Sequence, residues 1–336
     1  MENEVSQRVA GGVTALHWDK TLIACTTWEG TLHLIQPFAN DNDKIKRTIT
    51  NKAPLLDFAM LHTSQIVTAD LNGNIALHTT DNTSSQAQVI GNHDAAARCV
   101  AHCTSINATV SGGWDGCVKI WDARAADACV GKIQQPNKVF GMCAGPTSTA
   151  ETVLVVATAG RHVNVIDLRH PSEPVQKRES ALKCQTRCVR QMPCRSGYIL
   201  GSVSGRVAVE YFDPDAQVQA KRYAFKAHRS TVQGVDTTFP VNAIDFHPQF
   251  GTFATGGCDG RINVWDKDNR KRVCQYKGYP TSIAALEFSP SATEYLAFAV
   301  SYTYENGPVA HPPDELRVRK VAQSEVKARH REKATR

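Results

Sequence analysis

Serine, histidine and aspartate are the residue types of a nucleophilic triad, and this chain carries all three within one short region. His93 precedes the stretch "SGGWDGCVKIWDAR" (111–124), which contains Ser111 and Asp115. A serine deprotonated by a histidine that an aspartate orients would perform acyl transfer. The same acidic turn could instead be a metal-binding loop or a structural signature. Recurrence separates these alternatives, because a structural signature is repeated along a chain and a catalytic triad is not.

The pattern does recur. "GGWDGCVKIWD" (112–122) has a near copy, "GGCDGRINVWD" (256–266), in which Thr255, Asp259 and Trp265 take the positions of the serine, the aspartate and the second tryptophan. The chain also contains no phosphate-binding glycine loop, no H-E-x-x-H and no C-x-x-C. We therefore expect no enzyme, no metal and no cofactor.

Weaker copies of the unit extend over most of the chain and place a tight turn at regular intervals. Each unit combines β-prone runs of period two with Gly, Asp or Asn between them, which is typical of antiparallel strands. Four strands per 40–45 residues is the WD-repeat signature and predicts a β-propeller. Six equivalent turn positions and the start of a seventh strand, "ELRVRKV" (315–321), predict seven blades: Gly30, Gly73, Gly116, Arg161, Gly205, Gly260 and a position near Asp314.

A propeller needs a closed ring, because an open one exposes strand edges. The residues before Val13 are well placed to add the outer strand of the last blade. We therefore predict an all-β, seven-bladed propeller over residues 1–322 and a flexible basic tail over 323–336. Two connections, 227–240 and 301–314, are long enough to be functional loops.

Composition fits this architecture and bounds the partners. Hydrophobic residues make up 42% of the chain, and the longest apolar runs are strand-sized, so no membrane contact is expected. Eleven cysteines without framework spacing indicate reduced, mostly buried thiols of a nuclear or cytosolic protein. The net charge of +6 lies partly in the tail, which makes nucleic acid an unlikely partner.

The repeated polar residues are expected to brace each blade. In the third unit we expect Asp115 to accept hydrogen bonds from turn amides and from His93, and Ser111 to join His93 to the indole N–H of Trp121. Thr255, Asp259 and Trp265 would form the same structural tetrad in the sixth blade.

Residues beside the turns should share one end of the propeller. Tryptophans and arginines there have the composition of an interaction hot spot, and the arginines suit an acidic or phosphorylated peptide. The alternative is that each tryptophan covers its own blade tip and each arginine is merely solvated. The predicted rim consists of Trp28, Leu71, Trp114, Arg161, Arg206 and Arg261.

Long continuous segments resemble the spindle-checkpoint WD-repeat family of the Bub-three type. The similarity covers essentially the whole propeller and is strongest from about 93 to 321. The segments are "HDAAARCV", "GWDGCVKIWDAR", "TAGRHVNVIDLR", "RESALKCQTRCVR" (178–190), "GRVAVEYFDPDAQVQAKRYAFKAHR" (205–229), "FPVNAIDFHPQFGTFATGGCDGRINVWD" (239–266) and "YPTSIAALEFS" (279–289).

The resemblance implies a non-enzymatic adaptor of the spindle assembly checkpoint. Members of the family bind acidic GLEBS segments of checkpoint kinases and Mad-type proteins, and phosphorylated Met-Glu-Leu-Thr-like repeats of a kinetochore scaffold. Carried over by motif, Arg187 and Arg206 would meet the phosphate. Trp28, Trp114 and Arg187 would meet the GLEBS segment.

The rim adds two further residues, Arg161 and Arg261, to this expected peptide surface. The resemblance also implies a monomeric propeller within a complex, located in the nucleus and at kinetochores in mitosis, and also in the cytoplasm. Two alternatives stay open: a Rae/Gle-type mRNA-export factor that binds a nucleoporin GLEBS segment, and a generic WD-repeat scaffold subunit. The first turn departs from the pattern, with Glu29 where an aspartate is usual.

Overall fold

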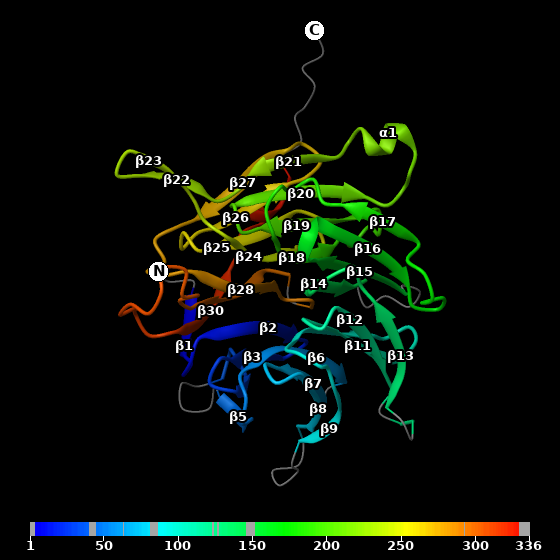
Figure 1. The fold of residues 1–336 in the computed structure, drawn as a ribbon. Helices are drawn as coiled ribbons and strands as arrows, with labels where there is room; N and C mark the ends of the chain where they lie inside the picture. Colours follow the sequence, from blue (N-terminus) through cyan, green and yellow to red (C-terminus); the bar gives the residue numbers. More distant parts are fainter. Residues whose placement is uncertain are drawn as a thin grey trace.

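Seven four-stranded antiparallel sheets are arranged around a common axis in the computed structural model (Figure 1). The structure describes residues 4–39, 45–62, 64–80, 87–122, 124–125, 128–145, 152–291 and 293–328. Each sheet is one blade, and its strands are called a to d from the axis outwards. The predicted all-β, seven-bladed propeller is confirmed.

The first four blades follow the chain in order. Blade 1 consists of β2 (Val13–Asp19), β3 (Leu22–Thr27), β4 (Thr31–Ile35) and β5 (Ile45–Thr50). Blade 2 consists of β6 (Leu55–His62), β7 (Gln65–Asp70), β8 (Asn74–Thr79) and β9 (Gln88–Asn92). Blade 3 consists of β10 (Ala97–Cys103), β11 (Ala108–Gly113), β12 (Cys117–Trp121) and β13 (Cys129–Gln134). Blade 4 consists of β14 (Val139–Ala144), β15 (Val153–Thr158), β16 (His162–Asp167) and β17 (Gln176–Glu179).

The last three blades carry the insertions and the closure. Blade 5 consists of β18 (Thr186–Gln191), β19 (Gly197–Ser202), β20 (Arg206–Tyr211) and β21 (Tyr223–Lys226), with the short helix α1 (Ala216–Gln219) before β21. Blade 6 consists of β24 (Val241–Phe246), β25 (Phe253–Gly257), β26 (Ile262–Asp266) and β27 (Lys271–Tyr276). Blade 7 consists of β28 (Ile283–Phe288), β29 (Tyr295–Val300), β30 (Glu315–Lys320) and β1 (Glu4–Arg8).

Burial along the strands explains why the sequence folds this way. The b strands β11 and β19 are buried at every position, because neighbouring blades cover both of their faces. The outer strand β5 has no fully buried residue and alternates exposed with half-exposed positions. The apolar core therefore lies between blades, as in the cluster that joins Leu16 and Ile23 of blade 1 to Ala297 and Val318 of blade 7.

The predicted closure of the ring by the N-terminal strand is confirmed. Strand β1 pairs antiparallel with β30 in blade 7, with Glu4 opposite Arg319. The Glu4 carboxylate accepts hydrogen bonds from Arg319 Nη1 at 2.7 Å and from the Tyr279 hydroxyl at 2.8 Å. The innermost strands of blades 7 and 1, β28 and β2, also contact each other, so the ring is joined at both its inner and outer edges.

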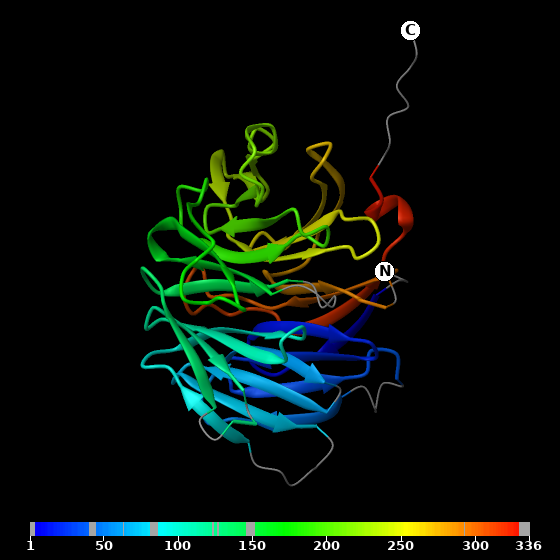
Figure 2. The same cartoon turned by 90° about the vertical axis from the view of Figure 1, so that its right-hand side faces the viewer.

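The two segments outside the repeats have defined structure. The connection 227–240 contains a hairpin of β22 (Arg229–Val232) and β23 (Val235–Thr238), which projects from the propeller (Figure 1). After blade 7 the chain forms the short helix α2 (Gln323–Val326), seen in red in Figure 2.

Helix α2 is anchored to blade 6. Val326 is buried, and its carbonyl accepts a 2.5 Å hydrogen bond from the Thr252 hydroxyl. The predicted boundary at residue 322 thus falls too early, because the chain stays packed through α2. Residues 329–336 of the predicted tail lie outside the described residues.

Each innermost strand has a β-bulge at its second position, which places one residue per blade at an equivalent point around the axis. We call these seven residues the bulge ring. All except the buried Leu56 are half-exposed. The ring consists of Thr14, Leu56, Arg98, Phe140, Arg187, Asn242 and Ala284.

Further along the same strands, charged side chains link blades across the axis. Glu287 accepts hydrogen bonds from Trp18 N at 3.0 Å and pairs with His17 Nδ1 at 3.1 Å, which ties blade 7 to blade 1. Arg190 of blade 5 pairs with Asp245 of blade 6 at 2.8 Å and with Glu287 at 3.4 Å. Burial would lower the pKa of His17, but Glu287 and Asp57 outweigh it, so the pKa is raised.

This network makes the stability of the propeller dependent on pH. Because the folded-state pKa of His17 lies above its unfolded value, its ion pair contributes fully below about pH 6.5 and is lost as pH rises through the folded-state pKa. We expect the melting temperature to fall over this interval, and the fall to be smaller in His17→Gln. Thermal melts from pH 5.5 to 9 measure this, with the exposed His170→Gln as control. An identical pH profile for wild type and His17→Gln would contradict the expectation.

Candidate peptide-binding face

The b–c turns and the d–a connections lie together at one end of the propeller, which we call the turn face. In each of five blades the connection after strand d donates a backbone hydrogen bond to the carbonyl at the turn. The pairs are Asn51 N to Gly30 O, His93 N to Gly73 O, Gln135 N to Gly116 O, Ser180 N to Arg161 O, and Ala227 N to Gly205 O, at 2.7–2.9 Å.

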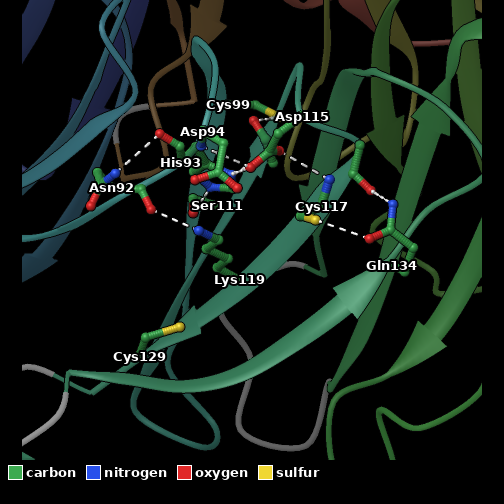
Figure 3. A network of polar contacts seen from close by, with 12 residues as sticks. Asn92, His93, Asp94, Cys99, Ser111, Asp115, Cys117, Lys119, Cys129 and Gln134 are labelled. Atoms are coloured by element: carbon green, nitrogen blue, oxygen red, sulfur yellow. Dashed lines mark hydrogen bonds and ion pairs between the residues drawn. The ribbon is translucent and has the colours of Figure 1, made fainter.

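The polar residues of the third blade form a continuous hydrogen-bonded chain (Figure 3). Trp121 Nε1 donates to Ser111 Oγ at 2.7 Å, and Ser111 Oγ lies 2.7 Å from His93 Nε2. His93 Nδ1 lies 2.9 Å from Asp115 Oδ2, and Asp115 also accepts from Cys117 N at 3.0 Å. The side chains of His93 and Asp115 are 0% and 6% exposed, so no substrate reaches them as in an acyl-transfer site.

Electrostatics supports a bracing role for this chain of residues. Burial lowers the pKa of His93 despite the opposing effect of Asp115, which keeps the imidazole neutral near pH 7. A neutral imidazole has one donor and one acceptor nitrogen, as the serine–histidine–aspartate chain requires. Burial opposes ionisation of Asp115, but His93 and two backbone N–H groups hold the pKa of this carboxyl below its usual value.

The sixth blade repeats the arrangement with a histidine that the sequence analysis did not assign. Trp265 Nε1 donates to Thr255 Oγ1 at 3.0 Å, and the ring of His228 lies 2.8 Å from both Thr255 Oγ1 and Asp259 Oδ1. The sequence pattern did not identify His228, because the inserted β22–β23 hairpin lies between this histidine and the first strand of blade 6. The interval from histidine to aspartate is 31 positions here and 22 in the third blade.

Trp28, Leu71 and Trp114 occupy equivalent positions at the start of their turns. Each donates its backbone N–H, at 2.9 Å, to the carbonyl oxygen of the residue immediately before strand a of its blade. Their exposed fractions are 46%, 36% and 36%, which is high for large apolar residues. The equivalent positions of blades 4 to 7 carry the smaller residues Ala159, Val203, Cys258 and Ser301.

The predicted rim arginines fall into different environments. Arg161 occupies the left-handed turn position with φ 69°, and its guanidinium donates to Ser180 O at 2.8 Å and Leu182 O at 3.1 Å. It also pairs with Glu179 at 2.9 Å. These bonds brace the d–a connection, so we remove Arg161 from the predicted peptide surface. Arg261 lies 4.0 Å from the tetrad aspartate Asp259 and stays one-third exposed.

Arg187 and Arg206 are both placed on blade 5 at the turn face. Arg187 is the bulge residue of β18, and Arg206 begins β20 directly after the turn glycine Gly205. Both are half-exposed. Within the described part of the chain neither side chain has a hydrogen bond or an ion pair. Two cationic groups are therefore open to a ligand on one blade.

Three further properties concern the cysteines, metal binding and membrane spanning. All eleven cysteines are free, and burial raises the pKa of the thiols of Cys25, Cys99 and Cys143 to about 12. In the described residues no group of three or more His, Cys, Asp or Glu side chains could hold a metal ion. No helix in the described ranges is long and apolar enough to cross a membrane.

Comparison with known proteins agrees with the propeller fold and identifies the family to which the chain belongs. The family model "WD domain, G-beta repeat" matches residues 84–122 and 221–266. "Mitotic checkpoint protein BUB3.1" of Arabidopsis thaliana is 51% identical over 71% of this chain and 70% of its own length. The chain belongs to the Bub3 family of mitotic checkpoint WD-repeat proteins. The resemblance stated from the sequence is thereby confirmed.

Similar proteins from other organisms include a second Bub3 protein and an mRNA export factor. "Mitotic checkpoint protein bub3" of Dictyostelium discoideum is 37% identical over 90% of this chain and 88% of its own length. "mRNA export factor GLE2" of Chaetomium thermophilum is 34% identical over 92% of this chain and 86% of its own length.

Proposed function

We propose that this Bub3-family protein is a non-enzymatic adaptor whose turn face binds two kinds of peptide. One is the acidic GLEBS segment of checkpoint kinases and Mad-type proteins. The other is a phosphorylated Met-Glu-Leu-Thr-like repeat of a kinetochore scaffold. The observation that carries the proposal is the grouping on one face of two exposed tryptophans, Trp28 and Trp114, with two arginines that have no partner in the described chain, Arg187 and Arg206.

The tryptophans support a peptide contact because they bring a large apolar surface to a face otherwise made of turns. Aromatic and arginine side chains dominate the binding energy of protein interfaces. The ammonium group of Lys138 lies 5.9 Å from the ring centroid of Trp114, so a positive charge adjoins this aromatic surface. An apolar surface with a positive charge beside it suits a segment that alternates apolar and acidic residues.

The arginines support recognition of phosphate. A phosphothreonine carries a charge of about −1.5 to −2 at pH 7 and three acceptor oxygens. Arg187 and Arg206 belong to the first and third strands of the same blade, and Thr186 pairs with Ser202 across the intervening ladder. The antiparallel sheet thus fixes the two backbone positions from which the guanidinium groups extend, and two cationic groups on one blade suit a polyvalent anion.

In this role the protein would bring checkpoint kinases to phosphorylated scaffold repeats. It would act as a monomeric propeller within the complex, in the nucleus and at kinetochores during mitosis, and also in the cytoplasm. Neither a membrane nor nucleic acid is needed for this function.

Replacing Trp28 with alanine is expected to weaken binding of a synthetic GLEBS peptide by at least ~2 kcal/mol, or about 30-fold in Kd, since a hot-spot aromatic is lost. Isothermal titration calorimetry measures the change. Val130→Ala is the control, because this side chain is 55% exposed on the outer strand β13, away from the turn face. A loss below ~0.5 kcal/mol for Trp28→Ala would remove that tryptophan from the binding surface.

The export-factor alternative rests on the similarity to GLE2 over most of the chain. It would keep GLEBS binding, with a nucleoporin as partner, but would not need phosphate recognition. Affinity capture from dividing cells separates the two functions. Checkpoint kinase and kinetochore proteins would support the adaptor role, whereas nucleoporins and RNA would support export.

A further inference from the structure

The connection 301–314 joins β29 to β30, where the other blades have a short b–c turn, and its charge differs from that of the rest of the turn face. It contains no lysine and no arginine, but it carries Glu305 and Asp314. The arginines described above lie on blades 3 to 6, so blade 7 brings the opposite charge to the same end of the propeller. The orange loop before β30 projects on the same side as the β22–β23 hairpin (Figure 1).

Hydrogen bonds within blade 7 hold this loop in one conformation. The Glu305 carboxylate accepts from the hydroxyl groups of Ser282 and Thr303, both at 2.7 Å. The Tyr302 hydroxyl accepts from Asn306 N at 3.1 Å. A loop that is ordered before it meets a ligand loses little conformational entropy on binding. The loop is therefore suited to present side chains to a partner.

Three aromatic rings gather on the loop. The ring centroid of Tyr302 lies 5.1 Å from that of Tyr304 and 5.2 Å from that of His311. Tyr302 is buried, but Tyr304 is 51% exposed, and its ring meets that of His311 at 80°. Tyr304 also has φ 58°, a left-handed conformation that is uncommon for a bulky residue and clusters at functional sites. The neighbouring contacts thus support an exposed tyrosine in a strained backbone position.

The Glu305 charge lies near the seam with blade 6. Cys258 Sγ is 3.3 Å from Thr303 Oγ1; burial is the largest cause of the raised pKa of this thiol, and the charge of Glu305 raises it further. Among the residues that the structure describes, no basic side chain forms an ion pair with Glu305. A carboxylate without a cation therefore stands next to the exposed tyrosine in the chain.

The loop adjoins the exposed tryptophan of blade 1. Val13 N donates to the hydroxyl oxygen of Ser301, the first residue of the loop, at 2.9 Å. A Cβ atom placed on Gly12 would lie 3.2 Å from Trp28 Cδ1 and 3.7 Å from Tyr302 O. The indole and the base of the loop thus flank the same glycine. A segment bound over Trp28 can therefore continue across the loop.

We propose that the loop 301–314 binds a lysine or arginine side chain that flanks the acidic segment of the partner, with the cation over the Tyr304 ring and paired with the Glu305 carboxylate. The inference rests on the proposed function, because it names a further group of the segment bound at Trp28. A cation is attracted to the face of a tyrosine ring. Opposite charges on blades 3 to 6 and on blade 7 would fix the direction in which the segment lies across the turn face.

The test compares two synthetic peptides from the same checkpoint kinase: the acidic GLEBS segment alone, and this segment extended at both ends by its natural flanking residues. Variants of the extended peptide have each flanking lysine or arginine changed singly to glutamine. The proteins are the full-length wild type, Tyr304→Asn, Glu305→Gln and the control Glu294→Gln. Calorimetric titration measures each Kd, and thermal melting verifies that each variant folds.

The substitutions are chosen to preserve the loop. Asparagine tolerates the left-handed conformation of Tyr304 but removes the ring. Glutamine keeps the size of Glu305 and can still hydrogen-bond both hydroxyl groups, but it removes the charge. Glu294 provides the control for loss of negative charge, because its side chain is 53% exposed at the opposite end of blade 7, where it pairs with Lys320.

We expect Tyr304→Asn and Glu305→Gln each to weaken the extended peptide at least fivefold and the short peptide less than twofold, and Glu294→Gln to change neither. One glutamine-substituted extended peptide should bind wild type and Glu305→Gln with equal affinity, which identifies the basic residue. If the extended peptide binds wild type and both loop variants alike, the inference fails while the proposed function stands. If only Tyr304→Asn weakens it, the contact is apolar and the proposed cation is refuted. If wild type binds neither peptide, both fail.

Discussion

Replacing Arg187 and Arg206 together with alanine is expected to abolish binding of a phosphorylated Met-Glu-Leu-Thr-like peptide. Each guanidinium would contribute charge-assisted hydrogen bonds of about 1.5–3 kcal/mol, so the pair accounts for at least ~3 kcal/mol, or more than 100-fold in Kd. Fluorescence anisotropy with phosphorylated and unmodified peptide measures the loss. The melting temperature should hardly change, because neither side chain has a polar partner among the described residues.

Arg124→Ala provides the control for removal of positive charge, since Arg124 is exposed and paired with Asp122 at 2.8 Å outside the turn face. It should leave phosphopeptide binding intact. Equal affinity of the wild type for phosphorylated and unmodified peptide would refute phosphate recognition altogether. If the double variant kept its full affinity, residues other than Arg187 and Arg206 would bind the phosphate.

The second large effect concerns stability. Asp115→Ala is expected to lower the free energy of unfolding by about 3 kcal/mol, because it leaves the buried His93 Nδ1 and the backbone N–H of Cys117 without an acceptor. Loss of the carboxylate also frees the turn that holds Trp114, so the peptide affinity should fall as well. Chemical denaturation measures the first effect and calorimetric titration the second.

Asp122→Ala is the matched control, because Asp122 ends the same repeat but pairs with the exposed Arg124 rather than with a buried partner. Exposed ion pairs of this kind contribute little to stability. If Asp115→Ala and Asp122→Ala were equally stable, the histidine–serine–aspartate–tryptophan chain would not brace the blade.

The blade count could be predicted because one backbone requirement recurs in six of the seven repeats. All six turn positions proposed from the sequence have positive φ, from 63° at Gly260 to 93° at Gly73. Only glycine adopts this conformation without strain, so the spacing of glycines reveals the period. Arg161 occupies the fourth position with φ 69°, and the flanking strands, rather than a glycine, indicated its place.

The candidate site was less predictable, because residue type does not reveal what a side chain contacts. Arg161 and Arg206 look alike in the sequence, yet Arg161 bonds two carbonyls of its own blade and Arg206 has no partner in the described chain. His228 was hidden by the inserted hairpin.

Ring closure by β1 has a consequence for how the protein is made. The bond between Glu4 and Arg319 joins residues 315 positions apart, so β1 leaves the ribosome long before its partner strand β30. Until β30 is synthesised, β1 and the open side of blade 7 have unpaired backbone edges, and bringing the two strands together carries a loop-closure entropy. Nascent chains that stop within blade 7 should therefore be targets for chaperones and proteases, whereas the finished ring has no open blade from which unfolding could start.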